Sequence, residues 1–207
     1  MYIDETLHHF LDDLASAQPT PGGGSTAALS GAMGAALASM VCRITLGKEA
    51  YAHVRQEIEE LLGKTEYLRS RFQQLMQEDV EAYGHLAKSY KLPRETSEER
   101  KYRTEMIQKQ LVEAALVPLE VVECAAELSK ACQRIAEIGS VTVLSDVATG
   151  SIHASCSGKG AAFMVLINLR SMKNDKLVAQ LEDRLNTALA IIVEGVDQVI
   201  NIVEGRA

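Results

Sequence analysis

Apolar positions recur with helical spacing along most of this chain. Large apolar side chains follow one another every three or four residues between about 49 and 90, from about 97 to 136, and from about 174 onward. That spacing places them on one face of an α-helix. A shorter set near the N-terminus predicts a first helix that ends before Pro19. Its members are Ile3, Leu7, Phe10, Leu11 and Leu14.

Two further segments, from about 25 to 46 and from about 141 to 172, are built mainly of small side chains. Residues 19–42 carry no charge at all, in a chain with 24% charged residues. A spanning helix needs about 20 strongly apolar residues, and too few of these side chains are large. Small side chains on every face instead indicate helices that neighbours approach closely. We expect two buried small-residue helices inside a bundle.

No segment alternates between apolar and polar residues long enough to require a sheet. The pattern therefore predicts an all-α fold, a long-helix bundle that forms one domain over residues 1–207. Helices of this length seldom bury all their apolar faces within one short chain. We therefore expect a dimer.

Composition narrows the functional class. The formal net charge of −7 argues against a general nucleic-acid binder, which usually has a basic face. Four cysteines without a Cys-x-x-Cys pair are typical of free thiols in a reducing compartment. The N-terminus is acidic where a signal peptide would be basic and then apolar. We expect a cytoplasmic protein without a membrane segment.

The uncharged stretch opens with Gly22, Gly23, Gly24 and Ser25. Glycines tolerate positive φ and let the backbone approach a ligand closely, and Ser25 is a good N-cap. The first turn of a helix offers free N–H groups and a positive dipole end to an anion or a polarised oxygen. No Gly-Lys-Ser/Thr follows, which excludes a P-loop. The alternative is a tight turn before a buried helix.

Four further polar residues are candidates for chemistry. Asp79 and Glu81 are two residues apart, about 200° around a helix, so only one of them can face a site; both could also belong to a solvated acidic patch. Asp146 opens a small-residue helix without a nearby cation, so it needs a partner or a raised pKa unless it is an N-cap. His153 lies two turns further on the same face, where a core histidine with a satisfied hydrogen bond is the alternative.

Asn168 lies inside an apolar helix and must satisfy its amide there, either by binding a ligand or by bridging helices. Glu78, Glu81 and His85 fall at positions i, i+3 and i+7 of a predicted helix, a spacing that a metal site could use. A di-iron bundle needs a Glu-x-x-His motif on each of two helices, which this chain lacks. We expect no metal.

Six segments match one family in order along the chain, from about residue 3 to 205. The segments are Pro19-Thr20-Pro21-Gly22-Gly23-Gly24-Ser25, Glu78–Tyr83, Leu92-Pro93 with Thr96-x-Glu98-Glu99, Val117-Pro118-Leu119, Ser145-Asp146-Val147 and Val165–Leu169. Together they resemble the cyclodeaminase domain of the formiminotransferase-cyclodeaminase family.

The resemblance implies a helical, dimeric domain that acts on a reduced folate, possibly a polyglutamylated one. Family members either close 5-formimino-tetrahydrofolate to 5,10-methenyl-tetrahydrofolate with loss of ammonia, or hydrolyse the methenyl compound to 10-formyl-tetrahydrofolate. Neither reaction needs a cofactor beyond the folate. Position for position, Asp79 matches an acid in the family's acidic motif.

We therefore expect Asp146 and Asp79 to be catalytic. Binding of the folate is assigned to the remaining candidates: Gly22, Gly23, Gly24, Ser25, Glu81, His153 and Asn168. The competing hypothesis is a non-enzymatic helical scaffold or regulatory dimer, which generic long amphipathic helices would also support.

Overall fold

The computed structural model describes residues 2–206, and within them every regular element is helical. The α-helices are α1 (Leu7–Leu14), α2 (Gly23–Leu46), α3 (Arg55–Tyr90), α4 (Ser97–Ile138), α5 (Leu144–Leu169) and α6 (Asp175–Arg206). Short 3-10 turns cover Tyr2–Asp4, Glu49–Val54 and Val141–Val143. The all-α prediction is confirmed.

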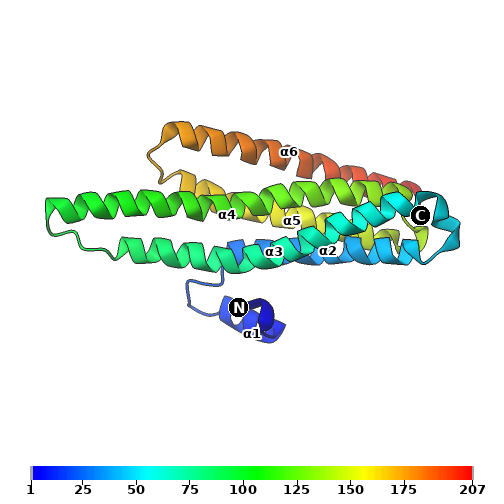
Figure 1. Ribbon diagram of the computed structural model, residues 1–207, viewed down its shortest axis with the longest axis horizontal. Helices are drawn as coiled ribbons and strands as arrows, with labels where there is room; N and C mark the ends of the chain where they lie inside the picture. The colour runs from blue at the N-terminus through cyan, green and yellow to red at the C-terminus, as the bar shows by residue number, and fades with distance from the viewer. Residues whose placement is uncertain (1, 207) are drawn as a thin grey trace.

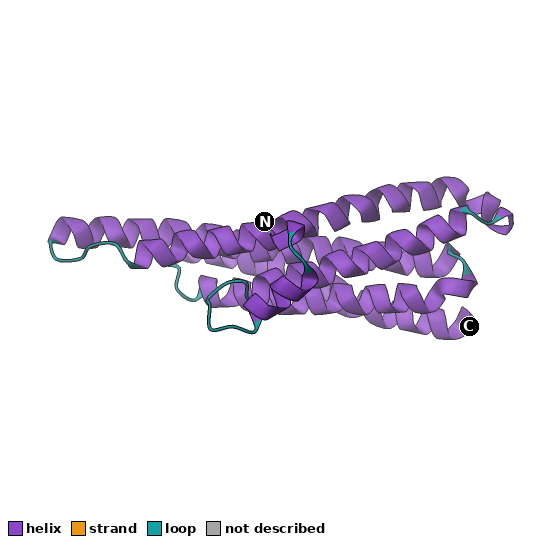
Figure 2. Ribbon diagram, turned by 90° about the horizontal axis from the view of Figure 1, so that it is seen from below, coloured by secondary structure: helices purple, strands orange, loops and turns teal. Residues whose placement is uncertain are grey.

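The five long helices run side by side as an elongated bundle (Figures 1 and 2). Helix α2 packs between α3 and α5, while α4 packs against α3, α5 and α6. The short helix α1 lies outside the bundle beside α2 and α3 (Figure 1) and buries Phe10. Because α2 and α5 run in opposite directions, the start of α2 lies beside the end of α5.

Small side chains allow α2 and α5 to pack closely against their neighbours. A Cβ at Gly31 would lie 2.4 Å from the ring of Phe72, and one at Gly34 would lie 2.7 Å from the carbonyl oxygen of Gly150. Helix α2 is long and apolar enough to cross a membrane, but 13 of its 24 residues are buried within the bundle. It is a core helix with one outward face, which the small-residue pattern did not reveal.

The start of α2 differs from the sequence prediction. Helix α2 begins at Gly23 with Gly22 as its N-cap, so Ser25 does not cap it, and no glycine has positive φ. At the start of α4, Thr96 is the N-cap and forms a capping box with Glu99. The start of α2 therefore does not depend on a positive φ angle at any of these glycines.

Candidate active site

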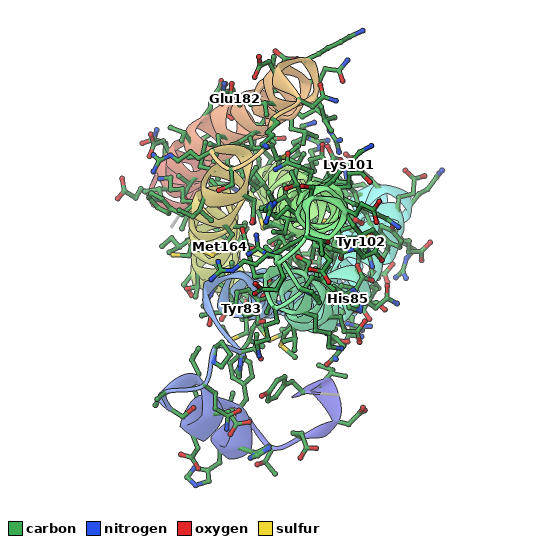
Figure 3. All side chains as sticks on the ribbon, turned by 90° about the vertical axis from the view of Figure 1, so that its left-hand side faces the viewer. Tyr83, His85, Lys101, Tyr102, Met164 and Glu182 are labelled. Carbon is green, nitrogen blue, oxygen red and sulfur yellow. The ribbon has the colours of Figure 1, made fainter. Side chains whose placement is uncertain are left out.

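A cavity of about 290 Å³ lies where the start of α2, the C-terminal third of α3, the middle of α4 and the end of α5 meet. Its walls are Pro19, Thr20, Gly22, Gly23, Gly24, Asp79, Ala82, Tyr83, Leu86, Ala114, Met164, Ile167 and Asn168. We call it the α2–α5 pocket. It brings together five of the candidate residues, Gly22, Gly23, Gly24, Asp79 and Asn168, from three separate segments of the chain. Figure 3 shows Tyr83 and Met164 on the same side of the bundle.

Asp79 is the only ionisable carboxyl in the pocket wall. Ser25 Oγ donates to Asp79 Oδ2 at 2.8 Å, and the backbone N–H of Ser25 also donates to this carboxyl. Burial raises the pKa of Asp79 above its usual range, and the two hydrogen bonds from Ser25 oppose that shift. A carboxyl with a raised pKa in a cavity is suited to proton transfer.

Gly24 makes room for this carboxyl. A Cβ at residue 24 would lie 2.0 Å from Asp79 Oδ1 and 2.5 Å from Asp79 Cγ, distances that no side chain tolerates. Gly22, the N-cap, has no side chain with which to cap α2, so Asp79 from α3 occupies that end of the helix. The glycines were expected to let a ligand approach the backbone closely, and at Gly24 it is the Asp79 carboxyl that does so. Contact between the glycines and a folate stays a prediction.

Asn168 does two things at once. Its Nδ2 donates to the carbonyl oxygens of Ala114 and Met164, both at 2.8 Å, which joins α5 to α4. Since both amide hydrogens are used, Oδ1 is the polar atom that Asn168 offers to the pocket as an acceptor. It thus bridges helices and also lines the cavity.

Eight residues of the pocket wall were not among the candidates, and they include Tyr83, Met164 and Ile167. The first two carry a signal in the sequence, because Tyr83 lies four residues after Asp79 and Met164 four residues before Asn168. Residues four apart share a helix face. Ile167 could be found only once the helices were placed.

Glu81 and His153 do not line the pocket. Glu81 is exposed and accepts a hydrogen bond from Gln77 Nε2 at 3.0 Å. His153 is half-buried, with Nδ1 3.1 Å from Ser30 Oγ, and lies about 22 Å along α5 from Asn168. The expectation that Asp79 and Glu81 face different ways is confirmed. The folate-binding roles of Glu81 and His153 stay predictions without support from this geometry.

Asp146 lies at the opposite end of α5 from the pocket. It is half-buried in the first turn, 22 residues before Asn168, or about 33 Å along the helix axis. Val143 occupies the N-cap position, so the N-cap alternative for Asp146 is wrong. Within one chain, the two predicted catalytic acids are not brought together.

Glu78 and His85, two of the three residues with the spacing of a metal site, lie in different surroundings. Arg71 Nη1 donates to Glu78 at 2.6 Å, while His85 lies on the other side of α3 from Tyr83 in Figure 3. Among residues 2–206, no three His, Cys, Asp or Glu side chains converge as a metal site would require.

A family model described as formiminotransferase-cyclodeaminase matches residues 6–187. The chain belongs to this family. It is 39% identical, over 92% of its length and 90% of the relative's, to the methenyltetrahydrofolate cyclohydrolase of Methylorubrum extorquens. It is 33% identical, over 90% of its length, to the formimidoyltransferase-cyclodeaminase of Rattus norvegicus, of which it spans 35%.

The crystal structure of formiminotetrahydrofolate cyclodeaminase from Thermotoga maritima superimposes with a TM-score of 0.89, covering 99% of this chain and 98% of that one at 28% identity. The family resemblance and the helical fold are therefore confirmed. The catalytic roles of Asp79 and Asp146 stay predictions.

Proposed function

We propose that this chain is an enzyme of folate one-carbon metabolism that hydrolyses 5,10-methenyl-tetrahydrofolate to 10-formyl-tetrahydrofolate. The observation that carries the proposal is the Asp79 carboxyl, with its raised pKa, in the wall of the α2–α5 pocket. The choice of reaction rests on the 39% identity to a methenyltetrahydrofolate cyclohydrolase of nearly the same length.

The pocket suits the ring system of a reduced folate. Apolar side chains such as Leu86, Met164 and Ile167 can cover the faces of a flat heterocycle. Asn168 Oδ1 and the Asp79 carboxyl are acceptors for ring N–H and amino groups. A cavity of about 290 Å³ holds the bicyclic ring and leaves the remainder of the folate outside.

Hydrolysis begins when water adds to the methenyl carbon between N5 and N10. The ionised Asp79 takes one proton from that water, and the same proton passes to N5 when the C–N5 bond breaks. The remaining hydroxyl proton is released to solvent as the C=O bond of the formyl group forms, so that cation and water give the neutral formyl product and one proton. Because burial raises its pKa, Asp79 is a stronger base than an exposed aspartate. The substrate is a cation, so an anionic carboxylate beside it also favours binding. No step uses a metal or a further cofactor.

Cyclodeamination is the second candidate, favoured by the TM-score of 0.89 to a formiminotetrahydrofolate cyclodeaminase. It proceeds at the same carbon: N10 attacks the formimino group, and ammonia leaves with a proton that a carboxylic acid can supply. A carboxyl with a raised pKa is more often protonated at neutral pH, as this role requires.

We further propose that the protein is a cytoplasmic homodimer that binds neither nucleic acid nor membranes. The four cysteines are free, and three of them are buried, as suits a reducing compartment.

The test is to incubate the protein with methenyl-tetrahydrofolate and follow the loss of its near-ultraviolet absorbance against the uncatalysed rate. Formimino-tetrahydrofolate is then supplied and ammonia is assayed. Turnover of the first alone supports a cyclohydrolase, and turnover of the second supports a cyclodeaminase. If neither compound turns over and no reduced folate binds, the proposal fails and the scaffold hypothesis replaces it.

A further inference from the structure

A second cavity, of about 420 Å³, lies between the end of α3 and the first half of α4. It shares no wall residue with the α2–α5 pocket. Figure 3 shows His85 and Tyr102, which line it, on the opposite side of the bundle from Tyr83 and Met164. Its volume falls in the range of small-molecule sites. We call it the α3–α4 pocket.

Ion pairs join α3 to α4 once every seven residues until this cavity begins. The pairs are Glu57–Arg134 at 2.5 Å, Lys64–Glu127 at 2.5 Å and Arg71–Glu120 at 2.6 Å. The next step of the same repeat brings Glu78 of α3 to the level of Glu113 of α4, two like charges. Arg71 also pairs with Glu78, at 2.6 Å. Within residues 2–206, Glu113 is therefore a carboxylate in the cavity wall without a cation.

Gln110 lies three residues before Glu113, on the same face of α4. It also lines the cavity and is only 8% exposed, and its Oε1 is buried without a hydrogen-bond partner in the described part of the chain. Leaving a buried acceptor without a donor costs stability, so folded proteins keep few such groups. One ammonium group has three N–H donors and can serve both Oε1 and the Glu113 carboxylate.

Lys88 supplies a cation to the same cavity. It makes no ion pair or side-chain hydrogen bond with any residue from 2 to 206. Helical side chains point back toward the N-terminus of their helix, and α3 and α4 are antiparallel, so Lys88 and Glu113 extend toward each other. His85, one turn before Lys88, offers a ring N–H beside it. The space between these opposite charges suits a ligand that carries both a carboxylate and an ammonium group.

The end of the cavity nearest the α3–α4 loop is apolar. Leu92 and Met106 line it together with Tyr102, which is 56% exposed. An aromatic ring can pack against the Tyr102 ring and the Met106 sulfur. The cavity thus offers an acceptor pair, a cation and an apolar wall.

We propose that the α3–α4 pocket binds a free α-amino acid with an aromatic side chain. The ammonium group meets Glu113 and Gln110, the carboxylate meets Lys88, and the ring covers the apolar end. A simple amine would leave Lys88 unpaired, and a simple carboxylate would leave Glu113 unpaired. The proposal is independent of the proposed function, because the two cavities have separate walls.

L-Tryptophan is the probe, because this chain has no tryptophan and the fluorescence of the ligand can be excited selectively. Titration with the wild-type protein should give a saturable change with a Kd of about 0.1–1 mM, as expected for a ligand of this size. L-Phenylalanine and L-tyrosine should compete for the site. Tryptamine and indole-3-propionate each lack one charge and should bind at least about tenfold more weakly. Absence of binding by all three amino acids at millimolar concentration, or equal binding of tryptamine, would overturn the proposal.

Substitutions place the binding in this cavity. Glu113→Gln and Lys88→Met should each weaken tryptophan binding at least about tenfold, with unchanged helical circular dichroism. Glu105→Gln is the matched control, because Glu105 is exposed on α4 and lies outside the cavity wall. It should keep the Kd within about two-fold. If Glu113→Gln binds as well as this control, tryptophan binds elsewhere and the proposal is wrong.

Gln110→Leu should separate binding from stability. The variant should bind tryptophan more weakly, yet its melting temperature should not fall, because an apolar side chain of similar size replaces an acceptor without a partner. A lower melting temperature with unchanged binding would contradict the role of Gln110 Oε1 as a ligand acceptor.

The folate assays keep this proposal separate from the proposed function. If the wild-type protein turns over a folate but binds no aromatic amino acid, the α3–α4 pocket proposal alone is wrong. If it binds tryptophan through Glu113 and Lys88 but turns over neither folate, the proposed function fails and the amino-acid site stands.

Discussion

Replacement of Gly24 by alanine should displace the Asp79 carboxyl without weakening helix α2. The new Cβ would lie 2.0 Å from Asp79 Oδ1 and 2.8 Å from Oδ2, so the carboxyl must move by roughly 1 Å or more. A misplacement of about 1 Å in a catalytic group costs about 10²-fold in rate. Alanine is also the better helix former, by roughly 0.5–1 kcal/mol, so weakening of α2 is not the expected cause of any loss.

Gly23→Ala is the matched control in the same turn. Its Cβ would lie 3.4 Å from the Met164 side chain, which is ordinary contact with a flexible neighbour. We expect Gly24→Ala to lower kcat for methenyl-tetrahydrofolate about 10²-fold, with unchanged helical circular dichroism. Gly23→Ala, whose Cβ does not reach Asp79, should raise KM at most and leave kcat within a few-fold of wild type. Equal losses in both variants, or near-normal activity of Gly24→Ala, would refute the steric reasoning.

Four other substitutions have defined outcomes. Asp79→Asn should lower kcat by about 10²–10⁴-fold. Because burial raises the pKa of Asp79, ionisation of this carboxyl costs stability as the pH rises through that pKa, so the variant's melting temperature at neutral pH should not fall. A large drop in melting temperature would contradict this. Ser25→Ala removes a hydrogen bond that lowers the pKa of Asp79, so the acid limb of the pH–rate profile should move to higher pH; an unmoved limb would exclude Asp79 as the titrating base. Asp146→Asn should reduce kcat more than it raises KM, whereas a lowered melting temperature with intact kcat would make Asp146 a structural residue. Glu81→Gln should retain activity within about two-fold, because the Glu81 side chain is exposed and lies outside the pocket wall. A loss of activity comparable to that of Asp79→Asn would place Glu81 in the site.

Much of the fold follows from the sequence because helix formation is local. The 3.6-residue period and residues such as Asn174, whose Oδ1 accepts from the N–H of Leu177 at 3.1 Å, identify the helices from neighbours in the chain. Small residues likewise predicted that α2 and α5 allow close approach of their neighbours, as at Gly34, where a Cβ would lie 2.7 Å from the carbonyl oxygen of Gly150. The start of α2 was predicted wrongly, because Gly22 and Ser25 are both acceptable N-caps when only neighbours in the chain are considered.

The site depends on contacts between residues far apart in the chain. Ser25 meets Asp79 across 54 positions, and Asn168 meets Ala114 across 54, because helices α2, α3, α4 and α5 pack in one particular order. Local spacing determines which face of a helix a side chain occupies, but not which helix that face meets. The sequence by itself therefore determined an all-α member of a folate enzyme family with Asp79 among its candidate acids. Only the tertiary structure decided that Gly24 admits the Asp79 carboxyl at the start of α2, and that Asp146 of the same chain lies about 33 Å along α5 from the pocket.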